Sequence, residues 1–388
     1  MISNFNTVAK PGGNLCNLAC DYCFYLETNV PRPACTAMAD ETLKAYIQNT
    51  ITSTPSGNVE FCWQGGEPTL CGLDFFEKVV SLQQRYRGNK TISNSLQTNG
   101  ILLNDKWARF LKENDFLVGL SIDGPASLHD ASRKTQAGKP SWAKVVQAIR
   151  CLQQHDVPVN AMVVVSHQSE TQGGTVYRCL TRELGLRHIQ FIPLVEPALS
   201  QSVTPEGWGV FLTDVFNEWL ENDVGTVFIQ FFDNLLGVWA GQPATLCTMQ
   251  PTCGQSLLVE KNGDVYSCDH FVSPKYKLGN LTQDAMADLA NSPFQQRFGR
   301  EKARLSARCT ACPWRFACHG GCPKHRTITL DNEAQNYLCE GYLAFFRHIT
   351  PYMNVMREIL LNDQPPSLVM NIIPEIREHV RTLTESEV

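Results

Sequence analysis

The chain has 388 residues, of which 43% are hydrophobic and 18% charged, a globular composition that excludes a disordered chain. Lysine and arginine number 33 against 38 acidic residues, so the net charge of −5 excludes the strongly basic balance typical of nucleic-acid binding. The longest apolar-rich stretch, Val227–Ala240, contains Gln230, Asp233 and Asn234 and is shorter than the ~18 residues of a membrane helix. Residues 1–6 lack the basic and apolar regions of a signal peptide. We therefore expect a cytoplasmic protein with neither nucleic acid nor membrane as partner.

Up to about residue 235, short β-rich runs alternate with segments of helical periodicity. The predicted strands are Phe5–Ala9, Val59–Trp63, Thr91–Gln97, Leu117–Ile122, Val159–Val165 and His188–Pro193. The predicted helices are Ala39–Thr50, Leu73–Arg87, Asp105–Asn114, Ala143–His155 and Tyr177–Leu184. Successive strand–helix units indicate an α/β fold with a parallel sheet and right-handed crossovers.

Glycine and polar residues cluster where three of these strands end. Gly65–Pro68 follows the second strand, Gln97–Gly100 follows the third, and Ser121–Gly124 overlaps the end of the fourth. Sites in parallel sheets form at the carboxyl ends of strands, where glycine lets the backbone approach a ligand closely. Ordinary βα turns favour the same residue types, so that alternative stays open for each string alone.

After about residue 240 the strand–helix alternation stops. Glycine, proline and cysteine become frequent, and Cys247–Cys339 is interpreted as loops and short turns that a metal would hold together. The tail is predicted to be helical from Ala344 to Asp363, to break at Pro365–Pro366 and then to resume. With a boundary near Gly237–Gln242, the predicted domains are residues 1–236, 237–345 and 346–388.

The chain contains sixteen cysteines, and a reducing cytosol disfavours a disulfide framework, so metal or redox chemistry is the better interpretation. Five of them are isolated and are expected to pack as small hydrophobic residues. These five are Cys35, Cys62, Cys71, Cys151 and Cys179.

The first cysteine cluster has the spacing C-x3-C-x2-C, formed by Cys16, Cys20 and Cys23 in the loop after the first strand. Three soft thiolates can hold three irons of a cubane iron–sulfur cluster and leave the fourth iron open to an exogenous ligand. A zinc knuckle is the alternative. Zinc motifs usually combine two ligand pairs and often include histidine, yet no histidine precedes His129.

The second cluster contains eight cysteines, enough to fill two [4Fe–4S] clusters or to bind two zinc ions. Its members are Cys247, Cys253, Cys268, Cys309, Cys312, Cys318, Cys322 and Cys339. Asp269 directly follows Cys268. That carboxyl group either caps a turn or acts as a base beside an electron acceptor.

The first cluster, together with Gly65–Pro68 after the second strand, resembles the radical SAM superfamily. The resemblance implies a partial (β/α)6 barrel and a [4Fe–4S] cluster whose open iron binds the amino and carboxylate groups of S-adenosyl-L-methionine. It also implies that the chain contacts this cofactor through a set of six residues. These are Tyr22, Gly65, Gly66, Ser121, Arg133 and Val195.

The later cysteines resemble the SPASM domain, which implies two auxiliary [4Fe–4S] clusters and therefore three clusters in the chain. The resemblance implies that Cys247, Cys253, Cys268 and Cys322 hold one of them. It implies that Cys309, Cys312, Cys318 and Cys339 hold the other.

From Lys10 to Phe346 the chain resembles the anaerobic sulfatase-maturating enzymes. The shared strings are Phe24–Tyr25, Trp63–Thr69, Asn94–Gly100, Val118–Pro125 and Leu278–Asn280. The resemblance implies that a 5′-deoxyadenosyl radical initiates oxidation of a Ser or Cys side chain in an unfolded or nascent sulfatase to Cα-formylglycine. It further implies Asp269 as the base, and a flavodoxin or ferredoxin as electron donor.

Two other interpretations of the sequence remain. One is a different SPASM peptide-modifying enzyme that forms a thioether or carbon–carbon crosslink. The other is an iron–sulfur electron carrier or a zinc-stabilised interaction protein without catalysis, which would leave the strings at Gly65–Pro68 and Ser121–Gly124 without a purpose.

Overall fold

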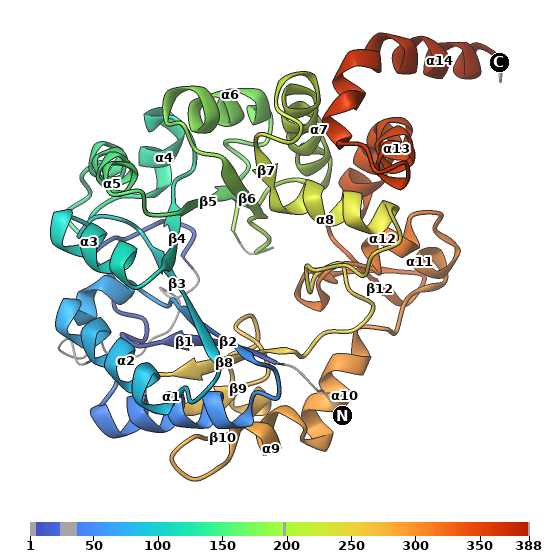
Figure 1. Cartoon of the computed structure of the whole chain (residues 1–388). Coiled ribbons are helices and arrows are strands. Elements are labelled where there is room, and N and C mark those ends of the chain that lie inside the picture. Colours follow the sequence, from blue (N-terminus) through green and yellow to red (C-terminus); the bar gives the residue numbers. More distant parts are fainter. Residues whose placement is uncertain (1–4, 24–36, 197–198, 387–388) are drawn as a thin grey trace. The chain divides into compact units, whose positions relative to one another are not determined.

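The computed structural model describes residues 5–23, 37–196 and 199–386 and divides into two compact units (Figure 1). The predictions for Cys35 and for the string Phe24–Tyr25 lie outside the described residues. The first unit comprises Met1–Ile122, His129–Asn160 and Thr252–Arg304. The second comprises Asp123–Leu128, Ala161–Pro251 and Leu305–Val388.

The first unit is built on strands in the order β10-β9-β8-β1-β2-β3-β4. The strands are β1 (Asn6–Lys10), β2 (Asn58–Trp63), β3 (Thr91–Thr98), β4 (Phe116–Ser121), β8 (Ser256–Glu260), β9 (Asp264–Tyr266) and β10 (Lys277–Asn280). Strands β8, β1, β2, β3 and β4 pair with one another in parallel, whereas β9 pairs antiparallel with β8 and β10 pairs antiparallel with β9.

Helices α1 to α3 lie together beside β1 to β4 in Figure 1. The helices of this unit are α1 (Asp40–Ser53), α2 (Leu73–Tyr86), α3 (Asp105–Glu113), α5 (Trp142–Gln154), α9 (Met286–Ala290) and α10 (Pro293–Glu301), with 3-10 helices η2 (Pro68–Cys71) and η4 (Pro274–Tyr276). Helix α3 begins after Asn104, whose side chain accepts hydrogen bonds from two backbone N–H groups of the first turn.

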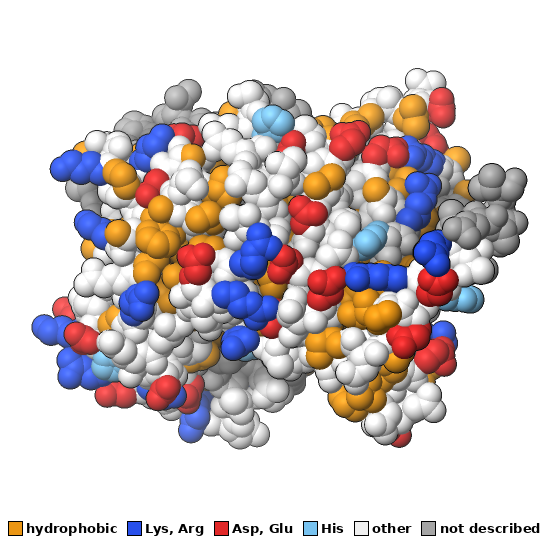
Figure 2. Space-filling view, turned by 90° about the horizontal axis from the view of Figure 1, so that it is seen from above, with side chains coloured by type: hydrophobic (Ala, Val, Ile, Leu, Met, Phe, Trp, Pro, Cys, Tyr) orange, Lys and Arg blue, Asp and Glu red, His pale blue; other side chains and the backbone are white. Residues whose placement is uncertain are grey.

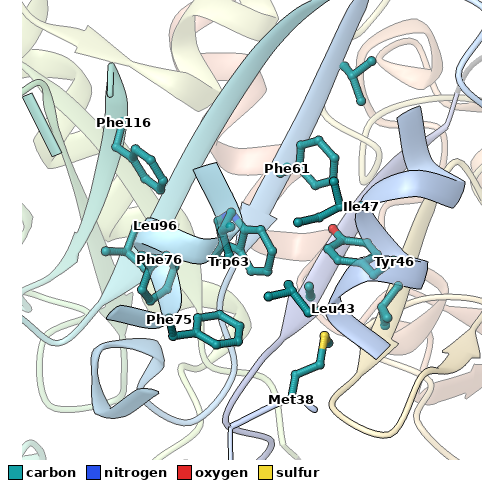
Figure 3. Packing of buried hydrophobic residues seen from close by; sticks show 14 of the residues in the cluster. Met38, Leu43, Tyr46, Ile47, Phe61, Trp63, Phe75, Phe76, Leu96 and Phe116 are labelled. Atoms are coloured by element: carbon teal, nitrogen blue, oxygen red, sulfur yellow. The ribbon is translucent and has the colours of Figure 1, made fainter. Parts of the chain in front are cut away.

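An aromatic core fixes these helices on the sheet (Figure 3). Strand β2 alternates, so that Val59, Phe61 and Trp63 are all buried on the helix-facing side. The Trp63 ring packs edge-on against Tyr46 of α1 and Phe76 of α2. The carboxyl end of β2 is therefore held rigidly where it enters the loop that carries Gly65–Pro68.

The second unit contains strands in the order β5-β6-β7, a separate hairpin and helices. Its strands are β5 (Val159–Val165), which begins in the first unit, β6 (His188–Pro193), β7 (Phe228–Ile229), β11 (Ile328–Leu330) and β12 (Glu333–Gln335). Its helices are α6 (Gly173–Arg178), the π-helix η3 (Cys179–Glu183), α7 (Pro205–Asn222), α8 (Gln230–Trp239), α11 (Ala307–Ala311), α12 (Arg315–Cys318), η5 (Pro323–His325), α13 (Cys339–Leu361), η6 (Pro366–Ile372) and α14 (Ile373–Ser386), and α4 (Ala126–Ser132) spans the division between units.

Helices α7 and α13 approach each other closely because glycines face each other. A Cβ on Gly209 would lie 2.8 Å from the Gly341 carbonyl oxygen, and one on Gly341 would overlap the Pro205 carbonyl. Around this contact Phe216 and Phe345 pack edge-on. The helix that starts at cluster cysteine Cys339 is thereby attached to the core of the second unit.

All six predicted strands are confirmed to within one residue at either end. Four predicted helices correspond to α1, α2, α3 and α5. The predicted helix Tyr177–Leu184 is instead the end of α6 followed by the π-helix η3. The tail is helical and is interrupted at the prolines as expected, but α13 already begins at Cys339.

The interpretation of Cys247–Cys339 as loops and short turns is wrong. Strands β8 to β12, the short helices α9 to α12 and the 3-10 helices η4 and η5 lie within this segment. Leu257, Leu258 and Val259 of β8 are fully buried because β8 pairs in parallel with β1. This segment supplies part of the first unit's core, so the compact units do not follow the predicted domain boundaries, which stay a prediction.

Positive and negative side chains are interspersed over the face that Figure 2 shows. The described part of the chain holds no helix with both the length and the apolar character to traverse a bilayer.

Candidate active site

The loop after β1, residues 12–23, carries the first cysteine cluster and packs directly on the loop after β2. The Gly66 N–H donates to the Gly13 carbonyl (2.8 Å), and the Glu67 N–H donates to the Leu15 carbonyl (2.7 Å). A Cβ on Gly66 would overlap the Leu15 carbonyl, and Gly65 has a φ of +125° that side chains rarely allow. Glycine is therefore required at both positions for two loops to meet backbone to backbone.

Residues 132–136 hold the same loop from its other side. The Ala19 N–H donates to the Lys134 carbonyl (2.8 Å), and the Asp21 N–H donates to the Ser132 carbonyl (3.1 Å). The Gln136 side chain adds donations to two loop carbonyls at 2.8 and 3.1 Å. Hydrogen bonds from residues 132–136 therefore help to hold the loop that carries the three thiols.

The thiols of this loop are partly buried and fit a soft-metal cluster. Burial raises the pKa of Cys16 to about 11, so its thiolate needs stabilisation. The Leu18 N–H already points at Cys16 Sγ (3.4 Å). The Cys23 N–H donates to the Cys20 carbonyl (3.0 Å), which closes a turn between those two cysteines. Three thiols on one short loop, with an N–H donor directed at the sulfur of Cys16, form a suitable donor set for iron.

Two of the residues predicted to contact the cofactor lie against each other. The Arg133 guanidinium carbon is 5.4 Å from the centre of the Tyr22 ring, and both side chains are buried. This is a cation–π arrangement next to the third cluster cysteine, Cys23. Ser121, half-buried at the end of β4, accepts a hydrogen bond from the Gln97 side chain (3.0 Å).

Asp269 lies beside the carboxyl end of β2. The Gln64 side-chain amide donates to its Oδ2 at 3.5 Å, and Gln64 directly precedes Gly65. The Cys268 thiol donates to its Oδ1 at 3.3 Å. The sequence interpretation missed Gln64. Its signal was a polar side chain at a strand end immediately before the glycine string.

The thiols of Cys309, Cys312, Cys318 and Cys339 line a single pocket in the second unit. Burial raises the pKa of Cys318 to about 12 and of Cys339 to about 11, with smaller contributions from the neighbouring thiols. Arg308 lines the same pocket and acts in the opposite direction on Cys339. Four partly buried thiols that line one pocket together with Arg308 and Arg315 match the requirements of an anionic thiolate-bound cluster.

The other predicted auxiliary set is distributed over both units. Cys253 and Cys268 belong to the first, and Cys247 and Cys322 belong to the second, so this set stays a prediction. The same holds for the cofactor contact at Val195, which is buried within the second unit.

Comparisons with known proteins identify both parts of the chain. Residues 11–177 match the family model of the radical SAM superfamily, and residues 247–313 match that of the SPASM iron–sulfur cluster-binding domain. A serine-type anaerobic sulfatase-maturating enzyme of Bacteroides thetaiotaomicron is 42% identical over 95% of each chain. The chain belongs to the anaerobic sulfatase-maturating enzyme family.

Other relatives agree with this assignment. A cysteine-type member from Clostridium perfringens is 35% identical over 90% of this chain and 98% of its own. The solved structure of native anSMEcpe with bound AdoMet and Cp18Cys peptide superposes with a TM-score of 0.85 at 34% identity, over 92% of this chain and 99% of that one. Streptococcus suis SuiB bound to its precursor peptide SuiA shares only the fold, at 14% identity, a TM-score of 0.61, and 86% and 75% coverage.

The predicted fold class, an α/β radical SAM partial barrel followed by a SPASM domain, is confirmed by these matches. They also establish a radical SAM, iron–sulfur enzyme family.

Proposed function

We propose that this enzyme oxidises a Ser or Cys side chain of an unfolded or nascent sulfatase polypeptide to Cα-formylglycine. The observation that carries the proposal is the position of Asp269. It lies within hydrogen-bond reach of Gln64, at the end of the strand whose following loop packs on the cysteine loop. Relatives named for both the serine-type and the cysteine-type reaction support it.

The cofactors supply chemistry that side chains cannot. The cluster on Cys16, Cys20 and Cys23, together with S-adenosyl-L-methionine, supplies a 5′-deoxyadenosyl radical that takes a hydrogen atom from the substrate's β-carbon. The contribution of the chain is to hold both reactants in place and to exclude water. Gly65 and Gly66 fix the cysteine loop, and Arg133 offers a guanidinium that suits the cofactor carboxylate.

Asp269 is the base in this proposal. The oxidation removes two electrons and two protons in total, and one proton leaves from the substrate hydroxyl or thiol. Gln64 orients the carboxylate through Oδ2. When Cys268 serves as a metal thiolate it has no proton to donate, so Oδ1 is free to accept the substrate proton.

The thiols of the second cysteine cluster provide for the transfer of the second electron that leaves the substrate. Cys309, Cys312, Cys318 and Cys339 would hold one of two auxiliary [4Fe–4S] clusters, which would supply an acceptor for the second electron of the substrate. A flavodoxin or ferredoxin supplies the electron that starts each turnover. Serine then yields the aldehyde directly, whereas cysteine yields a thioaldehyde that water converts to the aldehyde with release of hydrogen sulfide.

Asp269→Asn tests the assignment. The variant should still form 5′-deoxyadenosine but should oxidise peptide about 10²-fold more slowly or worse, the usual effect of losing a general base. Asp288→Asn, an exposed change in the same segment, is the control and should behave as wild type. Peptide oxidation at the wild-type rate by Asp269→Asn would remove Asp269 from the mechanism.

Product masses from Ser- and Cys-containing sulfatase-motif peptides separate the remaining alternatives. Formylglycine from serine is lighter by two hydrogen atoms and carries an aldehyde that hydrazines label. Cysteine additionally exchanges sulfur for oxygen. A product that has lost hydrogen only and has no aldehyde would indicate crosslinking and would contradict the proposal.

A further inference from the structure

The string Gln97–Gly100 at the end of β3 is not used by the proposed function, yet one of its residues reaches the cysteine loop. Asn99 is buried, and its side-chain Nδ2 lies 2.7 Å from Asn17 Oδ1 and 3.6 Å from Cys16 Sγ. Both contacts belong to the first unit. Asn99 is therefore a donor to one of the three thiols of the initiating cluster.

The orientation of this amide is set by its surroundings. Asn99 Oδ1 accepts the Ile101 backbone N–H (3.0 Å), so the oxygen is used in the turn and the NH2 group must face Asn17 and Cys16. An amide flipped by half a turn would place an oxygen against Asn17 Oδ1. The donor role towards Cys16 Sγ is thus the arrangement that satisfies every partner.

Glu67 fixes the backbone position of Asn99 through hydrogen bonds. The Glu67 carboxylate is buried. Its Oε2 accepts a hydrogen bond from the Asn99 backbone N–H (2.7 Å), and its Oε1 accepts one from the Thr98 hydroxyl (2.7 Å). The Glu67 backbone N–H donates to the Leu15 carbonyl in the cysteine loop (2.7 Å). Glu67 therefore ties the end of β3 through its carboxylate, and the loop that carries Cys16 through its backbone N–H.

Hydrogen bonds to the sulfurs of an iron–sulfur cluster change its reduction potential. The reduced cluster carries one more negative charge, so an N–H directed at its thiolate stabilises the reduced form more than the oxidised form. Together with Leu18 N–H, Asn99 gives Cys16 two donors. Losing the side-chain donor should make the cluster harder to reduce.

We propose that Asn99 is a positioning residue that raises the reduction potential of the cluster on Cys16, Cys20 and Cys23 through an N–H···S hydrogen bond, with Glu67 fixing its geometry. The inference rests on the proposed function only in requiring an iron–sulfur cluster at these cysteines. It does not depend on the peptide substrate or on Asp269.

The test is an anaerobic potentiometric titration of the reconstituted enzyme followed by electron paramagnetic resonance. Only the component of the spectrum that changes when S-adenosyl-L-methionine is added reports the cluster with an open iron. Asn99→Asp keeps the size and the Oδ1 acceptor but replaces the donor by a carboxylate oxygen. Its midpoint should move to a lower potential by about a tenfold change in the reduction equilibrium, which is about 59 mV.

Asn104→Asp is the matched control. It makes the same chemical change in the same unit, and the substituted side chain can still cap α3 with its oxygen. Its midpoint should equal that of wild type. An unshifted midpoint in Asn99→Asp, or an equal shift in Asn104→Asp, would overturn the proposal.

Asn99→Ser, paired with Asn104→Ser, covers the case in which the carboxylate prevents cluster assembly. Serine is too short to reach Cys16 Sγ and adds no charge. The midpoint potential of Asn99→Ser should therefore fall by less than that of Asn99→Asp, and the midpoint of Asn104→Ser should not change. Equal midpoint potentials in the two serine variants would refute the role of Asn99. Failure of the proposed function would be visible separately. Wild type would then show either no spectral response to the cofactor or no aldehyde product.

Discussion

Gly66→Ala is the substitution for which the structure gives the clearest magnitude. The added Cβ would overlap the Leu15 carbonyl and lie 2.7 Å from the carbonyl carbon of Asn14, so backbone must move. Movement breaks the hydrogen bonds from Gly66 to Gly13 and from Glu67 to Leu15, each contributing about 1 kcal/mol. Overpacking adds about 1–3 kcal/mol, so we expect the cysteine loop to be destabilised by about 3–5 kcal/mol.

The assay is iron and sulfide content per chain after anaerobic reconstitution, combined with thermal unfolding. Three cubanes correspond to about twelve irons, and loss of the first alone leaves about eight. Gly57→Ala is the control, because an added Cβ there meets no atom within 4 Å. A Gly66→Ala protein that keeps about twelve irons and has the same thermal unfolding midpoint as wild type would refute the argument that the contact between the two loops requires this glycine.

Three further outcomes are expected. Cys312→Ala should lower the iron content by about four while leaving S-adenosyl-L-methionine cleavage intact, measured by iron assay and by 5′-deoxyadenosine formation; unchanged iron would separate this pocket from cluster binding. Asp223→Asn should lower the free energy of unfolding in urea by about 2–4 kcal/mol. Buried Asp223 accepts hydrogen bonds from the Tyr177 hydroxyl (2.7 Å) and from two Arg182 nitrogens (2.7 and 2.8 Å). A change below about 1 kcal/mol would contradict this prediction. Burial, with a smaller effect of Arg377, lowers the pKa of His348. The stability that its neutral form contributes is therefore complete above the unfolded-state pKa of about 6.5 and is lost as pH falls below it. His348→Gln should flatten the plot of unfolding free energy against pH between about pH 7 and 5, and an unchanged slope would exclude this histidine.

Much of the fold was predictable because its signals are local. Apolar runs such as Val159–Val165 identify a buried strand by themselves, and the break at Pro365–Pro366 follows from the missing N–H of proline. The spacing of Cys16, Cys20 and Cys23 puts three thiols on one short loop whatever the rest of the chain does. Such features depend on residues close together in the chain.

Strand β8 was not predictable in this way. Its five residues are flanked by turns and cysteines, and only pairing with β1, about 250 residues earlier, makes Leu257 and Val259 part of a core. The ion pair between buried Lys10 and half-buried Glu260, 3.0 Å apart, arises from the same pairing. Without a partner strand, a run this short has no structure of its own.

By its own pattern the sequence determined the thiol spacing, the succession of strands and the glycines that must follow β2. Only the tertiary structure decided which distant side chains meet. Gln64 and Asp269 are 205 residues apart and come together because β8 and β9 extend the sheet beside β1 and β2. Asn99 reaches Cys16 because Glu67 binds both the end of β3 and the cysteine loop. Contacts of this kind depend on sheet order and register, which no local spacing encodes.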